Sequence, residues 1–165
     1  MRLRPGQRDT LEIPLWRGTA FPATPIEGRM FYRTDLDATF WYDATRAKWL
    51  GDLEADGGGY NGAMGGAGYL TRFGGVAFSA TIGIYVPYDA TVVGLSYSMA
   101  AALTGNFEVR RNGSAIASVS HAGAATGADM TLDADFASGG ILSLYNTAGA
   151  VTNPQLRVWW RRHAT

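Results

Sequence analysis

Few residues of this chain have side chains suited to chemistry, and they are widely spaced. The sequence of 165 residues contains two histidines, His121 in a Gly/Ala-rich segment and His163 close to the end, and it contains no cysteine. A zinc site takes three or four protein ligands that lie close together, and without cysteine neither thiolate sites nor disulfides can form. The sequence therefore indicates no metal site and no bound cofactor.

Carboxylates are the second group of side chains that could bind a metal ion or act as a general acid or base. Asp129, Asp133 and Asp135 lie close together in DMTLDAD, and the last two would share one face of a strand. Calcium takes several oxygen ligands, but the alternating pattern of a calcium loop, which ends in Gly and Glu, is missing. We interpret the three as solvated strand ends, and Asp35 and Asp37 as turn formers rather than a general acid/base pair.

Sequence motifs for enzymatic activity are also missing. Residues 57–62, GGGYNG, formally match the dinucleotide-binding pattern GxGxxG. No apolar strand precedes the match and no predicted helix follows it, so neither the turn nor the helix N-terminus that binds phosphate is expected. Walker A and GxSxG sequences are absent. With no nominated catalytic residue, the sequence predicts a protein that is not an enzyme.

The composition favours an all-β fold for the elements that position these side chains. Glycine is frequent, at 22 residues, charged residues make up 17% and hydrophobic residues 47%. Fourteen basic residues balance fourteen acidic ones, so no overall basic field attracts nucleic acid. The first residues lack the apolar core of a secretory signal, and no run is long enough to span a membrane. We expect a soluble chain that is synthesised in the cytoplasm and is not inserted in a membrane.

The largest predicted unit is a β-domain at residues 69–165. Short β-prone runs alternate there with Gly, Pro, Asn and Asp turns, a rhythm typical of a jelly-roll-like sandwich of about eight strands. The candidate strands are Gly75–Ala80, Ile82–Val86, Thr91–Met99, Phe107–Arg111, Ala115–Ser120, Met130–Ala134, Ile141–Tyr145 and Gln155–Arg161.

One hairpin has a specific signal. Asn112 and Gly113 separate two β-prone runs, and this pair favours the two-residue turn in which both positions have positive φ. The simplest register places Val109 opposite Ile116.

The last strand alternates between two faces. Leu156, Val158 and Trp160 form a predicted core face. The other face presents Arg157, Trp159 and Arg161. Arginine stacked on tryptophan suits a subunit interface or a ligand site, and the alternative is a semi-exposed tryptophan shielded by arginine stems.

The N-terminal third divides into three predicted parts. Residues 1–27 hold four prolines among apolar residues, which predicts an extended arm ordered against another surface; the alternative is an edge strand of its own domain. Residues 28–56 predict a three-stranded aromatic meander, Arg29–Arg33, Ala38–Tyr42 and residues 48–50, joined by Asp/Thr turns. Residues 57–68 are mostly glycine and predict a flexible linker or a set of tight turns.

One stretch resembles a module of bacteriophage virion proteins. Residues 22–53, PATPIEGRMFYRTDLDATFWYDATRAKWLGDL, have the prolines, the glycine, the aromatic strands with Thr-Asp and Tyr-Asp, and the closing Trp-Leu of that module. Asp43-Ala44 stands where Asp-Gly is usual. Residues 75–162 are similar, through YVPYDATVVGLS, GNFEVRRNGS and NPQLRVWWRR, to sandwich heads that cap trimeric phage fibres and to decoration proteins.

The resemblance implies a trimeric structural protein on the virion surface, a capsid decoration or head-fibre protein, bound to other virion proteins. Its arm and meander would anchor it through apolar residues, and the sandwich would face outward. The predicted anchoring residues are Leu11, Ile13, Leu15, Trp16, Phe21, Phe31, Tyr32, Phe40, Trp41 and Trp49.

Other functions stay open. A tail or baseplate fibre protein would use the sandwich to bind a host surface glycan. A carbohydrate-binding module would stack sugars on Tyr60, Tyr69, Tyr88 or Trp159, so Tyr88 joins the last-strand residues as a ligand candidate. A glycan-cleaving enzyme would need two suitably spaced carboxylates, and no pair is nominated.

Overall fold

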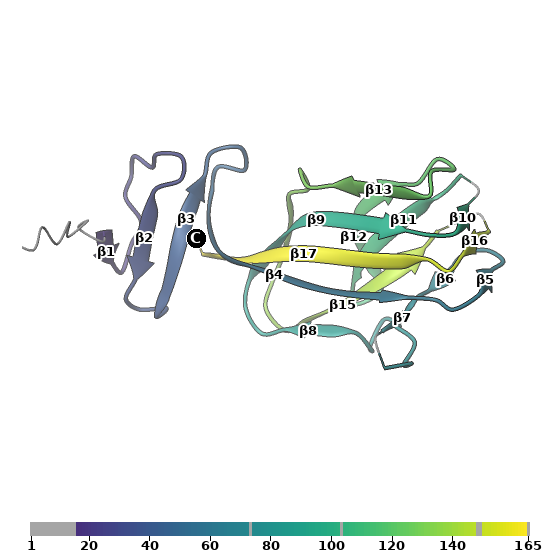
Figure 1. Ribbon diagram of the computed structural model, residues 1–165. Coiled ribbons are helices and arrows are strands. Elements are labelled where there is room, and N and C mark those ends of the chain that lie inside the picture. The colour runs from purple at the N-terminus through teal and green to yellow at the C-terminus, as the bar shows by residue number, and fades with distance from the viewer. Residues whose placement is uncertain (1–15, 73, 103, 148–149, 165) are drawn as a thin grey trace, which may run out of the picture.

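The computed structural model describes residues 16–72, 74–102, 104–147 and 150–164. These residues form strands and turns with no helix, which confirms the all-β prediction. A small aromatic meander lies at one end of an elongated molecule and a two-sheet sandwich forms the rest (Figure 1). Two long strands, β4 (Lys48–Gly59) and β17 (Gln155–Ala164), run through both parts.

The meander is the edge of a nine-stranded sheet with the order β1-β2-β3-β4-β17-β9-β13. Its strands β1 (Trp16–Gly18), β2 (Met30–Arg33) and β3 (Ala38–Asp43) lead into β4. The predicted meander is therefore confirmed, and β1 adds a parallel edge strand on β2. Residues 16–18, which the sequence analysis placed in an extended arm, therefore form an edge strand of their own domain, which was the alternative prediction.

The sandwich half of this sheet continues beyond β17. It contains β9 (Ala90–Ser98), β13 (Thr126–Asp129) and β14 (Ala134–Phe136), both paired with β9, and β7 (Thr71–Arg72), paired with β4. The second sheet has the order β12-β11-β15-β6, from β12 (Ser114–Ser120), β11 (Asn106–Arg111), β15 (Gly140–Asn146) and β6 (Gly68–Tyr69), with β8 (Ile84–Val86) paired with β15. A small third sheet holds β10 (Ala101–Ala102), β16 (Val151–Thr152) and β5 (Ala63–Met64).

The sandwich core lies between the two large sheets. Leu156, Val158 and Trp160 of β17 are buried in it together with Phe107 and Leu144 of the second sheet. The alternation predicted for the last strand is thus confirmed, because Arg157 and Trp159 lie on the opposite, less buried face. Burying one large apolar side chain of this kind stabilises the fold by about 1.5–3 kcal/mol.

The predicted hairpin is present, with a different register. Asn112 and Gly113 have φ values of 49° and 88° and form the two-residue loop between β11 and β12. Val109 pairs with Ala117 and not with Ile116, because the ladder shifts between Val109 and Arg110 and leaves Ile116 as the extra residue of a β-bulge. A bulge inserts one unpaired residue and so moves every later partner by one.

Two predicted strands are wrong. Met130–Ala134 is not a strand; β13 ends at Asp129 and β14 begins at Ala134, and the segment between them is held by a side-chain turn in which Asp129 accepts hydrogen bonds from Thr131. Gly75–Ala80 is not a strand either, and contributes only an isolated bridge between Thr71 and Ala77.

The glycine-rich stretch does not separate two domains. Residues 57–59 are the last part of β4, paired with Gln155–Arg157 of β17, and β5 and β6 follow before residue 70. Glycine is required in β4 because a Cβ on Gly58 would lie 2.5 Å from the Thr71 carbonyl oxygen and 2.6 Å from the Phe78 ring. The sandwich therefore begins within β4, not at residue 69.

Two β-bulges lie where the meander meets the sandwich. In β9 the register with β17 shifts next to Val93, and in β4 it shifts at Gly51 and Asp52. Arg46, in the turn before β4, donates to the carbonyl oxygens of Val93 (3.3 Å), Met130 (2.8 Å) and Leu132 (2.8 Å).

A second arginine serves the other bulge. Arg161 of β17 donates from Nε to the Gly51 carbonyl oxygen (2.7 Å) and from its terminal nitrogen to that of Leu50 (3.2 Å). Bulges leave backbone groups without ladder partners, and a buried carbonyl without a donor is costly. The two arginines therefore stabilise the bend at which the meander joins the sandwich.

Truncation tests where the sandwich begins. A chain starting at residue 69 loses β4, which pairs with β17 along residues 53–59. We expect this chain to aggregate or unfold, whereas a chain starting at residue 53 keeps the sandwich and unfolds cooperatively on heating. Circular dichroism and gel filtration of the two truncations provide the measurement. Equal stability of both would contradict the strand assignment.

Removing the Arg46 guanidinium tests the junction. Arg46→Met removes the guanidinium that donates to three backbone carbonyls and to Asp43 Oδ2, and we expect a loss of about 3 kcal/mol in the free energy of unfolding, measured in urea. The matched control is Arg72→Met, which breaks a more exposed ion pair with Asp56 and should cost less than about 1 kcal/mol. Equal effects of the two substitutions would show that Arg46 does not hold the junction.

Candidate functional site

Three of the predicted anchoring rings form the core of the meander. Phe31, Phe40 and Trp49 are buried, and Phe21 packs on all three, with its ring parallel to that of Trp49 at 4.8 Å. Arg33 adds its guanidinium over the Phe21 ring at 4.7 Å. These rings are covered by their own chain, so the fold itself explains why a short meander needs them: three short strands bury enough area only through large side chains.

The remaining predicted anchoring residues lie differently. Trp16 is 45% exposed, with the Arg29 guanidinium 4.1 Å from its ring. Tyr32 donates its hydroxyl to Asp37 in the following turn. Leu11, Ile13 and Leu15 lie outside the described residues.

Trp41 is the predicted ring that faces a groove. It pairs with Met30 of β2 and is half-buried. The groove has a volume of about 420 Å³ and is also lined by Leu53, Asp52 and Arg161. Met30 is 39% exposed and Leu53 56%. This outer face of the meander therefore presents apolar side chains that are available to a partner.

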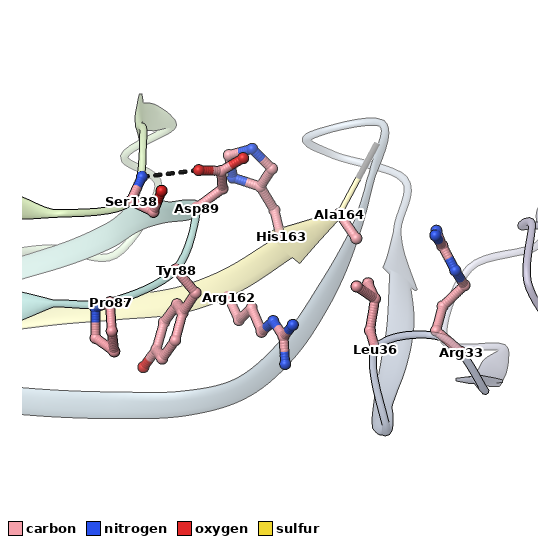
Figure 2. A pocket seen from close by; sticks show the side chains of 9 residues that line it. All are labelled: Arg33, Leu36, Pro87, Tyr88, Asp89, Ser138, Arg162, His163 and Ala164. Carbon is pink, nitrogen blue, oxygen red and sulfur yellow. Dashed lines mark hydrogen bonds between the residues drawn. The ribbon is translucent and has the colours of Figure 1, made fainter.

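A cleft of about 360 Å³ lies between the meander and the sandwich (Figure 2). Arg33 and Leu36 line it from the meander side, and Tyr88, Asp89 and Arg162 from the sandwich side.

Most polar groups of this cleft are already paired. Arg33 binds Asp35 through two hydrogen bonds of 2.9 and 2.8 Å, and Asp89 accepts from the Ser138 amide. Tyr88 donates its hydroxyl to Glu54; partial burial and this carboxylate both raise the pKa of Tyr88. The polar groups of the cleft therefore bind one another and hold two parts of the chain together, which leaves few of them for a ligand.

Two of the three carboxylates considered for calcium are bound by a lysine. Lys48 Nζ lies 2.6 Å from Asp133 Oδ1 and 2.7 Å from Asp135 Oδ1, and the Thr91 hydroxyl also donates to Asp135. Partial burial works to raise the pKa of Asp135, and the hydrogen bonds from Lys48 and Thr91 outweigh it, so its pKa lies below the ordinary value. These side chains tie the start of β4 to the sandwich.

The last-strand candidates separate into two environments. Trp159 and Arg157 lie in a shallow trough of about 320 Å³, with Ser96, Ser98 and Gln155. Arg161, by contrast, is committed to main-chain carbonyls, and its partial burial lowers its pKa. Tyr88 lies in the junction cleft. The structure therefore groups only Trp159 and Arg157 of the four.

Sequence reasoning missed the junction. Arg46 and Lys48 were read only as turn and strand-end residues, because the sandwich groups that they bind lie 47 to 87 positions away in the sequence. The Tyr-Asp sequence that opens the turn was the one available signal that Arg46 has a structural role. Asp43 accepts hydrogen bonds from the Arg46 amide and guanidinium, which fixes the arginine side chain.

Comparisons with protein families, curated protein sequences and solved structures found no match. Within the described ranges, no three His, Asp or Glu side chains gather in a way that could hold a metal ion. The same part of the chain contains no helix that is long and apolar enough to cross a membrane.

The Asp43–Arg46 pair predicts a pH dependence. Partial burial works to raise the pKa of Asp43, and the Arg46 hydrogen bonds overcome it, so the folded-state pKa is lowered. A carboxyl of this kind stabilises the fold above its unfolded pKa, and the contribution is lost as the pH falls through the folded pKa. We expect stability to fall below about pH 4, and Asp43→Asn to flatten that acid limb while lowering stability at pH 7.

Urea unfolding between pH 7 and pH 2.5 measures this effect. Arg46→Met, which removes the group that lowers the Asp43 pKa, should flatten the acid limb in the same direction. An acid limb of wild-type steepness in both variants would contradict the assignment.

Proposed function

We propose that this protein is a structural protein of the bacteriophage virion surface, a trimeric capsid decoration or head-fibre protein held by its N-terminal region. The main support is the structure of the segment that resembles the phage module. Residues 22–53 contain the meander with its own aromatic core, at one end of an elongated molecule (Figure 1). An attachment unit at one end leaves the sandwich at the other end free to face outward.

The anchoring surface proposed here is narrower than the set of rings in the sequence. Burial of Phe31, Phe40 and Trp49 assigns them to the meander core. We assign contact with a neighbouring virion protein to Trp41, Met30 and Leu53 around the outer groove, whereas the exposed Trp16 ring lies against the Arg29 guanidinium. A half-buried tryptophan beside exposed apolar side chains is typical of an interface hot spot, where one residue contributes about 2 kcal/mol or more.

The junction suits this function. A meander tied to the sandwich by Arg46, Lys48 and the continuous strand β4 transmits its orientation to the whole molecule. A protein anchored in this way projects its sandwich at a fixed angle. An attachment unit on a flexible linker would not set that angle.

Substituting Trp41 tests the proposal. We expect Trp41→Ala to reduce the amount of the protein in purified phage particles by about tenfold or more, measured by quantitative mass spectrometry, while the purified variant keeps its fold. Phe40→Ala removes a fully buried ring and should unfold the meander, at a cost of about 3–5 kcal/mol. Tyr85→Ala, at a 62% exposed ring on the sandwich, is the matched control.

Two results would overturn the proposal. One is the absence of the wild-type protein from purified particles. The other is wild-type incorporation of Trp41→Ala, which would remove the outer groove as the attachment site. Sedimentation analysis of the purified protein tests the trimer separately.

A further inference from the structure

The outer face of the sandwich half of the large sheet has an unusual composition. Along β17 the residues that point outward are Gln155, Arg157 and Trp159. Each is flanked by small residues on both neighbouring strands. The paired residues are Gly59 and Ser98 for Gln155, Gly57 and Ser96 for Arg157, and Ala55 and Gly94 for Trp159.

Small neighbours leave a shallow trough beside this row of larger side chains. Side chains stand roughly perpendicular to a sheet, so the central row is not shielded by taller residues beside it. The space next to the row has a volume of about 320 Å³. Glycine is required beside the ring, because a Cβ on Gly94 would lie 2.5 Å from Met130 Sδ and 3.4 Å from Trp159 Cε3. Met130 therefore packs against the sheet at the tryptophan end of the trough.

The charge of the trough is positive. Arg157 is exposed, and within the described part of the chain it makes no hydrogen bond, ion pair or ring contact. Two other arginines of the sandwich are paired with carboxylates: Arg72 with Asp56 and Arg110 with Glu108. No carboxylate is among the residues that line the trough. An unpaired guanidinium is suited to bind an anionic group, which it can hold through two parallel hydrogen bonds.

We propose that this trough is a binding site for an acidic saccharide. The Trp159 ring offers a flat apolar surface against which the C–H face of a pyranose ring packs. Arg157, two residues along the strand, lies about 7 Å away and binds the carboxylate of the same or the next sugar. Gln155, Ser96 and Ser98 supply donors and acceptors for hydroxyl groups. A few placed polar groups around an aromatic surface are typical of a small-ligand site.

A second copy of the chain fits the trough less well. A stable protein interface buries about 800 Å² on each partner around an apolar core, and the trough offers one half-buried indole among Gly, Ser and Ala. A two-fold contact through this face would also bring two unpaired Arg157 guanidinium groups together, which is unfavourable without acidic partners.

The test is a calorimetric titration of the full chain with a panel of uronic-acid and sialic-acid oligosaccharides, each matched with its carboxyl-esterified form. We expect at least one acidic oligosaccharide to bind, with an affinity that falls as salt is added. Its neutral ester should bind about tenfold more weakly or not at all. Trp159→Ala and Arg157→Gln should each weaken binding by about tenfold or more. The controls are Tyr85→Ala and Arg17→Gln, which remove an exposed ring and an exposed charge elsewhere.

Several results would overturn the proposal. These are failure of every acidic oligosaccharide to bind, equal binding of acid and ester, or wild-type affinity in both trough variants. An oligomer that dissociates in Trp159→Ala would assign the face to a second copy instead. Because the trough variants leave the outer groove of the meander intact, their incorporation into particles should be normal. Failure of saccharide binding is thus distinguishable from failure of the proposed virion function.

Discussion

The structure depends on the continuity of β4 and β17 through the junction. Their ladder runs from Gly59 and Gln155 in the sandwich to Trp49 and Ala164 in the meander. Such a ladder must bend to serve two packed units, and the bend is made by bulges in β4 and β9. Bulges free backbone carbonyls, and two arginine side chains donate to them. Without these donors the same bend would leave buried oxygens unsatisfied, which costs about 1–3 kcal/mol for each.

This continuity makes the two parts of the molecule depend on each other. The end of β17 reaches the meander, where Ala164 packs against the aromatic cluster and the Arg162 guanidinium lies 5.9 Å from the Phe40 ring. In the other direction, the first residues of β4 place Lys48 against two aspartates of the sandwich. The meander alone has only a few buried rings, so contact with the sandwich supplies the remaining cover. The sandwich in turn uses the second half of β4 as an interior strand of its sheet.

Local features were predictable from the sequence, and features that depend on distant partners were not. Alternation in β17 and the Asn112-Gly113 turn are properties of a few consecutive residues, and both predictions are correct. The glycines of β4 were read as a linker because glycine weakens an isolated strand. Glycine is required in this strand because Thr71, Phe78 and Gln155 approach its backbone too closely to leave room for a Cβ. The anchoring rings show the same limit: Phe40 and Trp41 are neighbours of like type, and only the pairing of β3 decides which of them is buried.

Two arginines of β17 illustrate how one strand face can serve two purposes. Arg157 and Arg161 point to the same side of the sheet, with Trp159 between them. Arg161 lies next to the β4 bulge, where the Leu50 and Gly51 carbonyls take its donors. Arg157 lies where the ladder is regular, so no main-chain carbonyl is freed and its guanidinium keeps its donors for another group. The position of the β4 bulge therefore determines the difference between the two arginines. Arg161, beside the bulge, has a structural role, and Arg157, away from it, keeps its donors for a ligand.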